Sequence, residues 1–558
     1  MPAPRVRAER FADTADDVMF PRLSEAKLQK FRKLGQVMTA QPGDVLFEQG
    51  VRDAPFYVLV SGAVDFVDRR PDAEVWFSRV EVPTFLGDIA MFTGEPTVVA
   101  CLAAAESELI VFPRPKLRRM LAEWPEFSEM VLDALSARRE WLEQEGHGVL
   151  RLIADRSSRR AFEVRDLLER NLLPVKWYDT ANDPESDVLL DSVGLDRGAT
   201  PVLIRNDTVL RNPSSAQVAR ELGLRAEVDG DRFDLVILGA GPAGLAAAVY
   251  GGSEGLSTFV AESWGPGGQA GTSMRIENYL GFPTGVSGEE LTRRATLQAR
   301  RFDAQFSSFH PAVEVVDGPD GLLRVDLADG QHVLARSLLV ATGARWRRLQ
   351  AENLERFEGA GVYYAASRSD AARCRGEDVV VVGGGNSAGQ AAGHLATHAQ
   401  SVTVVVRRDG LEATMSQYLI DRLEHRPNVR IVTSCEIAGF EGETGLSGVR
   451  VRHRDGGEET IPASAAFLMI GAEPCSEMVR GMLATDDRGF LSAGMDALSS
   501  NGGGPQWAIS DREPHLLETT REGVFAAGDV RSGSTKRVAA AVGDGSMAVR
   551  FAHEVLSG

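Results

Sequence analysis

The sequence predicts a multidomain chain: a small β-barrel comes first, a short α/β segment follows, and two larger α/β units built on glycine-rich turns complete it. A chain of 558 residues is too long for one hydrophobic core. Short strand-like runs with regular turns fill residues 1–145, and strand and helix patterns alternate from residue 148 onward. Two patterns of strand, glycine turn and helix, at residues 236–244 and 379–388, mark the larger units. Together these observations favour a mixed α/β fold class with a separate β-barrel.

Charge and composition restrict the partners. The net charge is −18 and the isoelectric point is about 5.1, so the chain as a whole should repel nucleic acid and anionic membrane surfaces. No early segment has the basic start, apolar core and small-residue cleavage site of a leader, and no apolar stretch approaches about 18 residues. We therefore expect a cytoplasmic protein without a membrane span and without a nucleic-acid partner.

The cysteines lie far apart in the sequence. No two are separated by only two residues, so there is neither a CxxC pair nor a zinc-binding pattern. A disulfide scaffold and a metal site are therefore not expected, and each cysteine is interpreted as a small buried or half-buried side chain. They are Cys101, Cys374, Cys435 and Cys475.

The first 145 residues change from a helical pattern capped by Ser24 to short strands, and then back to helical patterns. A Pro-Gly-Asp turn precedes the first strand, and Gly50 ends that strand. This order predicts a small β-barrel flanked by helices. The predicted helices cover residues 20–34, about 114–122 and 125–145, and the predicted strands include 45–47 and 56–60.

Three stretches of this segment resemble the cyclic nucleotide-binding domain: QPGDVLFEQG, YVLVSG and FLGDIAMFTGEPTVVA. The resemblance implies that fold for residues 1–145. In that family a carboxylate binds the ribose and an arginine binds the cyclic phosphate; Asp88 matches the carboxylate, whereas Thr97 stands in the place of the arginine. A cyclic nucleotide is therefore one candidate ligand, and a barrel kept for docking or dimerisation is the alternative.

Strand and helix patterns alternate at residues 148–226 in the order β, α, β, α, β, β, α. That order resembles the glutaredoxin or thioredoxin-like fold, and Thr200 and Pro201 occupy the place of the family's cis proline. The family carries a CxxC where its first helix begins, but residues 156–160 read RSSRR and hold no thiol. The resemblance therefore implies a structural or docking domain without dithiol chemistry, and arginines that steer an anionic partner are the alternative. The predicted strands are 149–154, 175–178, 202–204 and 209–211, and the predicted helices are 159–170, 184–192 and 214–222.

The GAGPAG turn predicts a dinucleotide-binding site. Hydrophobic residues predict a strand before it, and small residues predict a helix after it. In such a turn Gly239 allows the tight bend, Gly241 lets backbone N–H groups approach a pyrophosphate, and Gly244 lets the helix pack closely on the strand. The following strand ends at Glu262, whose carboxylate can accept a hydrogen bond from a ribose 2′-hydroxyl.

The stretch from residue 231 to the end resembles low-molecular-weight thioredoxin reductase. Further motifs occur in the same order, namely GGQ, IENYLGFP, ATGA, VFAAGDV and AAAVGDG. The resemblance implies an FAD-binding domain at residues 231–347 and 474–558, an NADPH-binding domain at 348–473 inserted in it, and a homodimer. The residues implied to hold FAD are Gly239, Gly241, Pro242, Ala243, Gly244, Glu262, Gly268, Gln269, Asn278, Thr342, Gly343, Gly528, Asp529, Lys536, Arg537 and Val538.

A second glycine turn, GGGNSA, follows a predicted strand at residues 379–382. The next predicted strand, 402–406, ends with Arg407 and Arg408 instead of an acidic residue. Two guanidinium groups at this place can accommodate a 2′-phosphate, which favours NADPH over NADH; a solvated pair at a strand end is the alternative. The residues predicted to hold NADPH are Gly383, Gly385, Asn386, Ser387, Ala388, Arg407 and Arg408.

The redox-active cysteine pair of thioredoxin reductases has no counterpart here. In that family a CxxC precedes the nicotinamide strand, in a context such as YCATCDG. The corresponding residues read YAASRSD, with Ala365 and Arg368 at the cysteine positions. Neither side chain can attack a disulfide, so no catalytic residue is predicted. The thioredoxin reductase-like reductases of ferredoxin and flavodoxin also lack this pair.

The resemblance and the missing dithiol together predict an FAD-dependent NADPH oxidoreductase that passes electrons through FAD to an unidentified small-molecule or protein acceptor. Two alternatives stay open. One is a nucleotide or redox sensor whose N-terminal domains respond to the bound nucleotides, and the other is a disulfide reductase in which a partner's dithiol reacts directly with the flavin. A sensor should be reduced once and then stall with every acceptor, so turnover separates the first alternative from an enzyme.

Overall fold

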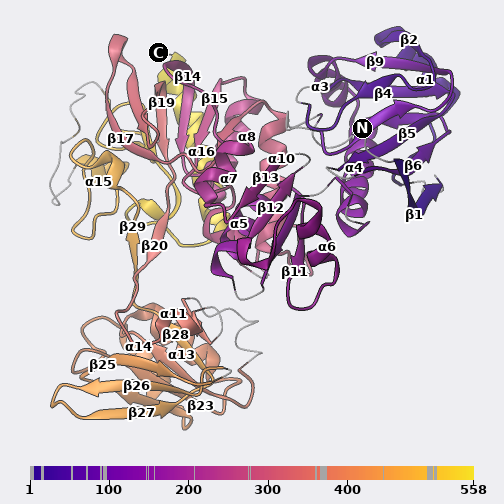
Figure 1. Ribbon diagram of the computed structural model, residues 1–558. Helices are drawn as coiled ribbons and strands as arrows, with labels where there is room; N and C mark the ends of the chain where they lie inside the picture. Colours follow the sequence, from indigo (N-terminus) through magenta and orange to yellow (C-terminus); the bar gives the residue numbers. More distant parts are fainter. Residues whose placement is uncertain are drawn as a thin grey trace. The chain divides into compact units, whose positions relative to one another are not determined.

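The computed structural model consists of two compact units (Figure 1). One comprises Met1–Thr342, Glu477–Ala484 and Leu491–Gly558, and the other comprises Gly343–Ser476 and Thr485–Phe490. Each unit has its own hydrophobic cores. The structure describes the whole chain except residues 1–4, 14–17, 52–53, 71–72, 88–90, 92–96, 146, 149, 156–157, 206–207, 274–275, 277, 359–360, 365–373, 444, 499–506, 508–511 and 558.

The larger unit begins with the predicted β-barrel, made of two sheets with strand orders β1-β6-β5-β8-β3 and β2-β9-β4-β7. Helix α1 begins at Glu25 rather than at residue 20, because Ser24 has an extended backbone and its hydroxyl accepts a hydrogen bond from the Lys27 backbone N–H. Phe20 instead lies in the barrel core. The strands are β1 Arg5–Asp13, β2 Gln36–Ala40, β3 Val45–Phe47, β4 Phe56–Ser61, β5 Val64–Arg69, β6 Glu74–Val80, β7 Thr84–Leu86, β8 Ala100–Ala103 and β9 Ser107–Phe112; the helices are α1 Glu25–Leu34, α3 Arg114–Glu123 and α4 Pro125–Glu145.

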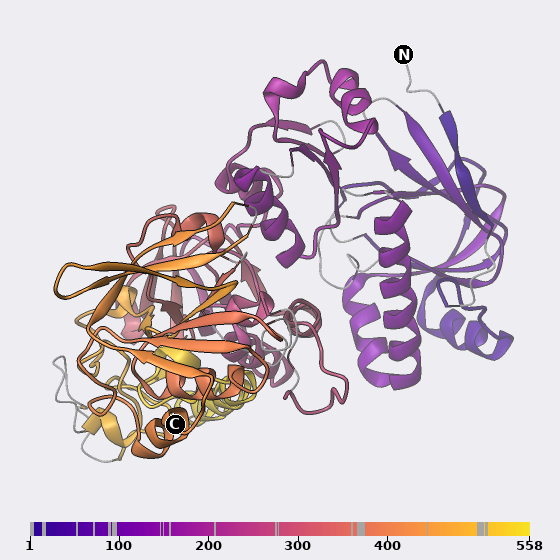
Figure 2. The ribbon, with the colours of Figure 1, turned by 90° about the horizontal axis from the view of Figure 1, so that it is seen from below.

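Helix α4 packs along the barrel and completes its core (Figure 2). Its Val131 and Leu135 are fully buried in the same apolar cluster as Phe31, Phe56 and Phe112. Burial of one such side chain stabilises the fold by about 1.5–3 kcal/mol. The cluster therefore joins the helical and strand parts of this segment into one core.

The segment after the barrel has the predicted βαβαββα order and a sheet in the order β11-β10-β12-β13. Strands β10 and β11 are parallel, and β12 runs antiparallel to both β10 and β13. The peptide bond between Thr200 and Pro201 is cis. Ser158 caps α5 by accepting a hydrogen bond from the Ala161 N–H; the two residues before it lie outside the described part of the chain. The elements are β10 Leu150–Ala154, α5 Arg159–Arg170, β11 Val175–Asp179, α6 Glu185–Ser192, β12 Val202–Arg205, β13 Thr208–Arg211 and α7 Ser215–Glu221.

A buried polar cluster joins the barrel to this thioredoxin-like segment. Arg151 on β10 and Asp68 on β5 are both buried, and their side chains form an ion pair of 3.2 Å. Arg70 pairs with the same carboxylate at 2.8 Å, and its guanidinium lies 3.4 Å from Nδ1 of His147. The His147 ring stacks on Phe77 of the barrel, with the ring centroids 4.5 Å apart.

The environment of His147 predicts a measurable pH dependence. Burial lowers the pKa of its imidazole to about 4, because the charged form loses solvation and the neighbouring cations Arg70, Arg151 and Lys176 repel it, while Asp68 acts in the opposite direction. The unfolded chain takes up this proton near pH 6.5 and the folded chain only near pH 4, so acidification through that window lowers the stability of the fold.

We expect NMR of the full chain with ¹³C-labelled histidine to show a neutral imidazole for His147 down to about pH 4. The spectrum of a His147→Gln variant assigns the signal by its loss. A His147 signal that titrates near pH 6.5 would contradict the buried, stacked geometry.

The first glycine turn belongs to a seven-stranded sheet in the larger unit. Strands β16, β15, β14 and β19 are parallel neighbours, β30 pairs with the end of β19, and β18 and β17 continue the sheet in antiparallel fashion. Helices α8 and α16 cross closely, since a Cβ atom at Gly545 would lie 2.0 Å from the Ala243 carbonyl oxygen. The strands are β14 Asp231–Leu238, β15 Thr258–Ala261, β16 Gln305–Ser307, β17 Ala312–Asp317, β18 Leu323–Leu327, β19 His332–Val340 and β30 Val524–Ala526; the helices are α8 Pro242–Ser253, α9 Gly268–Gly271, α10 Gly288–Arg301, α15 Met495–Leu498 and α16 Val538–Ser557.

The smaller unit holds the second glycine turn in a five-stranded parallel sheet of order β21-β28-β22-β23-β24. An antiparallel three-stranded sheet, β25-β26-β27, and the two-stranded pair β20-β29 complete it. The strands are β20 Ala344–Trp346, β21 Val362–Tyr363, β22 Asp378–Val382, β23 Ser401–Val405, β24 Val429–Val432, β25 Cys435–Glu441, β26 Gly448–His453, β27 Glu458–Pro462, β28 Ala465–Leu468 and β29 Ala472–Pro474; the helices are α11 Leu354–Phe357, α13 Asn386–Leu395 and α14 Gln417–Glu424.

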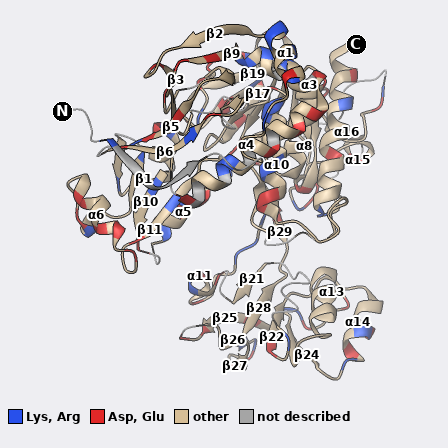
Figure 3. Cartoon of the chain, turned by 90° about the vertical axis from the view of Figure 1, so that its right-hand side faces the viewer, with Lys and Arg blue, Asp and Glu red and all other residues tan. Residues whose placement is uncertain are grey.

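On helix α10 the acidic residues Glu289 and Glu290 lie in the first turn and the basic residues Arg300 and Arg301 lie in the last turn (Figure 3). Among the helices that the structure describes, none is both long enough and apolar enough to cross a membrane.

Candidate functional site

The bend between β14 and α8 requires glycine at two positions. Gly239 has a φ of +97°, and a Cβ atom there would lie 2.6 Å from the Ala341 carbonyl oxygen. A Cβ atom at Gly244 would lie only 1.9 Å from the carbonyl oxygen of Gly239. Gly239 therefore allows the bend next to Ala341, and Gly244 allows the close packing of the helix on the strand.

Gly241 has a different role, because the space beside it is open. It precedes α8 with an extended backbone, and a Cβ atom there would meet nothing nearer than the Gly268 Cα atom, at 4.0 Å. Pro242 and Ala243 then begin the helix, so the N–H groups of its first turn and the positive end of the helix dipole face this space. The geometry fits an anionic pyrophosphate placed directly against the backbone.

Glu262 lies beside the turn and is buried. Its carboxylate accepts hydrogen bonds from the Ala240 N–H at 2.6 Å and from the Trp264 N–H at 3.0 Å. The Ser263 hydroxyl also donates to this carboxylate at 3.0 Å. A carboxylate offers about four acceptor positions, so one is left for a ribose hydroxyl.

The glycine loop at residues 265–271 packs directly on the first turn. The Gly267 N–H donates to the Ala240 carbonyl oxygen at 2.8 Å, and a Cβ atom at Gly268 would lie 2.9 Å from the Gly241 Cα atom. Gln269 in this loop is exposed. The structure thus brings Gly268 and Gly241 together, as expected for two parts of one site.

The segment around Gly528, in the C-terminal part of the chain, packs against the start of α8: a Cβ atom at Gly528 would lie 3.1 Å from the Ala243 Cβ atom. The Gly528 N–H donates to the Asp544 carboxylate at 3.1 Å, and Arg531 pairs with that carboxylate at 3.2 Å. Burial raises the pKa of the half-buried Asp529 carboxyl and Asp544 raises it further, whereas Lys536 lowers it. The contribution of Asp544 was not predicted, although it stands in the quoted AAAVGDG motif.

The remaining predicted FAD residues lie on three other segments of the chain. Asn278 is exposed, and its neighbour Glu277 lies outside the described residues. Lys536 and Arg537 are exposed directly before α16, which begins at Val538. Thr342 ends the long first segment of the larger unit, and Gly343 begins the smaller unit.

The second glycine turn repeats this logic in the smaller unit. Gly383 has a φ of +141°, and a Cβ atom there would lie 2.4 Å from the Met469 carbonyl oxygen, so glycine is required. Gly385 precedes α13, and a Cβ atom there would meet only the Thr414 carbonyl oxygen, at 3.8 Å. Ser387 is exposed and Ala388 fully buried at the start of the helix. Asn386 accepts a hydrogen bond from the Ser416 N–H at 2.7 Å and so connects the turn to the loop after β23.

Arg407 and Arg408 are both exposed where β23 ends. Within the described part of the chain no carboxylate pairs with either guanidinium group. The adjacent Asp409 is occupied by Arg454 at 2.9 Å and by the Ser434 hydroxyl at 2.9 Å. The arginine pair is therefore available to an anion from solution.

The cysteine side chains are mostly buried. Cys101, Cys374 and Cys435 are buried, Cys475 is half-buried, and none of these four described residues forms a disulfide. The two positions that correspond to the family's CxxC, Ala365 and Arg368, lie outside the described residues. Within the residues that the structure covers, no three His, Cys, Asp or Glu side chains form a cluster that could hold a metal ion.

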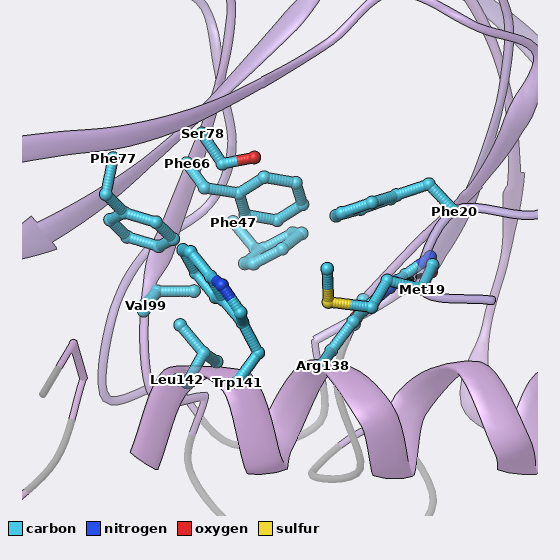
Figure 4. A pocket seen from close by; sticks show the side chains of 11 residues that line it. Met19, Phe20, Phe47, Phe66, Phe77, Ser78, Val99, Arg138, Trp141 and Leu142 are labelled. Atoms are coloured by element: carbon cyan, nitrogen blue, oxygen red, sulfur yellow. Dashed lines mark hydrogen bonds between the residues drawn. The ribbon is translucent and has the colours of Figure 1, made fainter. Parts of the chain in front are cut away.

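An apolar pocket of about 30 Å³ lies between the strands of the barrel and α4 (Figure 4). Arg138 lines this pocket and donates to the carbonyl oxygens of Met19, Phe85 and Gly87 at 2.7–2.9 Å. The Thr97 hydroxyl already makes two hydrogen bonds: it donates to the Glu48 carbonyl oxygen and accepts from the Val51 N–H. Asp88 lies outside the described residues. Neither Arg138 nor Thr97 is thus available to a cyclic phosphate.

Comparisons with known proteins identify relatives of two parts of the chain. Residues 233–545 match the family described as pyridine nucleotide-disulphide oxidoreductase, and residues 37–123 match the cyclic nucleotide-binding domain. A thioredoxin reductase of Listeria monocytogenes is 34% identical over 319 residues, which cover 57% of this chain and 91% of that protein. A bifunctional thioredoxin reductase/thioredoxin of Mycobacterium leprae is 31% identical over 316 residues, 56% of this chain and 64% of that protein. The crystal structure of a thioredoxin reductase from Streptococcus pyogenes aligns with 59% of this chain and 99% of its own, at 29% identity and a TM-score of 0.48.

Proposed function

Because the chain belongs to the pyridine nucleotide-disulphide oxidoreductase family, we propose that it oxidises NADPH with a bound FAD and passes the electrons on without a dithiol of its own. One observation carries the proposal. Both glycine turns leave an open space beside the glycine that precedes the helix, at Gly241 and at Gly385, while their other glycines are tightly packed. One chain thus has two separate cradles that fit a dinucleotide pyrophosphate.

FAD fits the turn in the larger unit. Gly241 and the N-terminus of α8 would bind its pyrophosphate, Glu262 would accept the ribose hydroxyl, and Asp529 would lie beside the flavin side of the molecule. Bound flavin supplies the capacity to accept a hydride and release electrons, and the residues of the chain bind and orient it.

NADPH fits the turn in the smaller unit. Gly385 and the N-terminus of α13 would bind the pyrophosphate, and Arg407 and Arg408 would bind the 2′-phosphate. The open space at Gly385 and the exposure of the two guanidinium groups support this assignment.

The missing cysteine pair restricts which electron acceptor this chain can use. The relatives named thioredoxin reductase share the fold, but this chain has Ala365 and Arg368 where that family carries its cysteine pair. A disulfide substrate would have to react with the flavin directly, so we propose an acceptor that takes electrons without thiol exchange, either a small molecule or a protein carrier.

An anaerobic titration of the FAD-loaded chain tests this proposal. NADPH should bleach the flavin absorbance band promptly, NADH should do so slowly, and added quinone or oxygen should restore the band over many cycles. A band that stays oxidised would overturn the proposal. Bleaching followed by a stall with every acceptor would favour the sensor, and rapid reduction of thioredoxin would favour a disulfide reductase that uses the partner's dithiol.

We propose that the barrel is a docking module rather than a cyclic nucleotide receptor. Two observations support this. The buried ion pair between Asp68 and Arg151 connects the barrel to the thioredoxin-like segment, and the Thr97 hydroxyl already donates to the Glu48 carbonyl oxygen. Calorimetric titration of the full chain with cyclic AMP and cyclic GMP should give no saturable heat, and saturable binding of either would contradict the assignment. The homodimer and the cytoplasmic location remain predictions from the sequence.

A further inference from the structure

The thioredoxin-like segment contacts the candidate flavin site through the end of one helix. Arg170, the last residue of α5, donates from Nη1 to the Gly268 carbonyl oxygen at 3.1 Å. Gly268 is the residue whose Cα atom lies against Gly241 at the pyrophosphate cradle. The Arg170 guanidinium group therefore contacts Gly268, which in turn lies against Gly241 at the candidate pyrophosphate site.

A second contact from the same helix fixes the start of that loop. The Asp166 carboxylate receives the Arg170 Nε at 2.8 Å and the Trp264 indole N–H at 2.6 Å. Trp264 packs against the apolar core of the thioredoxin-like segment together with Phe309, and the two ring centroids lie 5.5 Å apart. Arginine, aspartate and tryptophan thus form one hydrogen-bonded chain between α5 and the loop.

The backbone near the loop is tied to the same segment. The Ser308 N–H donates to the Leu224 carbonyl oxygen, and the Ser307 hydroxyl accepts from the Ala226 N–H, both at 2.9 Å. Ser307 also accepts, through its carbonyl oxygen, from the Glu262 N–H at 3.0 Å. The contact therefore reaches both the glycine loop and the acidic residue predicted to bind the ribose.

The opposite end of α5 carries the position where the thioredoxin family has its thiols. That helix is 12 residues long, about 18 Å at 1.5 Å per residue. Its N-terminus, capped by Ser158, lies at the far end from Arg170. The end in contact with the glycine loop is thus the end that carries no redox group in that family.

We propose that the thioredoxin-like segment is a positioning element of the flavin site, in which Asp166 and Arg170 hold the loop at residues 265–271 in the geometry that FAD binding requires. The inference rests on the proposed function, because it assigns FAD to this cradle. The segment without thiols thus has a role in binding the cofactor. Because the loop is already ordered before FAD binds, FAD binding does not include the entropic cost of ordering it.

The test compares Arg170→Met with Arg170→Lys and with Arg159→Met, in the full chain. Arg159 lies on the same helix, is exposed, and pairs across the surface with Glu163, so it is the matched control. Loss of a charge-assisted hydrogen bond that orders the loop should raise the FAD dissociation constant about tenfold in Arg170→Met. Arg170→Lys should recover part of this, because the ammonium can reach the carbonyl oxygen but cannot also present a fork to Asp166.

Two readouts separate positioning from general stability. Hydrogen exchange in the loop of the FAD-free chain should accelerate in Arg170→Met and not in Arg159→Met, and the visible circular dichroism of bound flavin should change. Trp264→Phe keeps a six-membered aromatic ring and removes the indole donor, and its effect on FAD binding should be less than additive with Arg170→Met, because both side chains donate to Asp166. Unchanged FAD affinity and exchange in Arg170→Met, with normal FAD binding by the wild-type chain, would overturn this inference alone. A wild-type chain that does not bind FAD would overturn the proposed function as well.

Discussion

Replacing Gly241 by alanine is expected to weaken FAD binding about a hundredfold while the fold is retained. The nearest atom to the new Cβ would be the Gly268 Cα atom, at 4.0 Å, and the backbone at Gly241 is extended with a φ of −71°, so alanine fits the FAD-free chain without strain. The methyl group would instead occupy the space where the pyrophosphate meets the backbone. The loss of one or two charge-assisted hydrogen bonds there costs about 3 kcal/mol, which is roughly a hundredfold.

The measurement is a fluorescence titration of the FAD-free chain with FAD, alongside circular dichroism and thermal unfolding. Gly445→Ala is the matched control, because that glycine also has open space around it and lies in the other unit. Gly244→Ala gives the opposite pattern: its Cβ would lie 1.9 Å from a backbone oxygen, so the fold itself should be destabilised. Unchanged FAD affinity in a folded Gly241→Ala chain would show that the pyrophosphate lies elsewhere.

The parts of the site that depend on a local turn could be predicted from the sequence. Gly239 and Gly383 follow hydrophobic strands and adopt positive φ angles, and each is in contact with a backbone carbonyl oxygen that excludes any side chain. A short motif is enough to encode the positive φ angle, and it also encodes the requirement at Gly244, where a Cβ atom would lie 1.9 Å from the Gly239 carbonyl oxygen in the same turn. The βαβαββα order and the barrel were predictable for the same reason, since their signals are periodic and local.

The contacts between distant segments could not be predicted. Asp166 and Trp264 are 98 positions apart, and so are Arg170 and Gly268. On a predicted helix Arg170 is indistinguishable from a solvated arginine, and only the packing of two segments shows what it contacts. The commitment of Thr97 to the Glu48 carbonyl oxygen was hidden for the same reason.

Replacing both Arg407 and Arg408 by alanine is expected to reduce the preference for NADPH over NADH about a hundredfold. Each guanidinium group that binds the 2′-phosphate contributes about 1.5 kcal/mol or more as a charge-assisted hydrogen bond, and NADH has no such phosphate to lose. The kcat/KM for NADPH should therefore fall while that for NADH stays nearly constant. Rates of flavin reduction with each nucleotide, measured anaerobically by stopped flow, give this ratio without knowledge of the acceptor.

The control is the double variant Arg430→Ala and Arg452→Ala, which also removes two positive charges from this unit. Both side chains are 60% exposed on strands of this unit, and each pairs with a glutamate at the surface. If the first pair acted only by attracting an anionic nucleotide from solution, the control would lower the NADPH rate as much, and both effects would disappear at high salt. Direct contact with the 2′-phosphate predicts a different result. The rate of flavin reduction should fall with NADPH but not with NADH, should fall only in the variant of Arg407 and Arg408, and should stay low at high salt. An equal loss for both nucleotides would assign the arginine pair to general attraction and leave the preference to other residues.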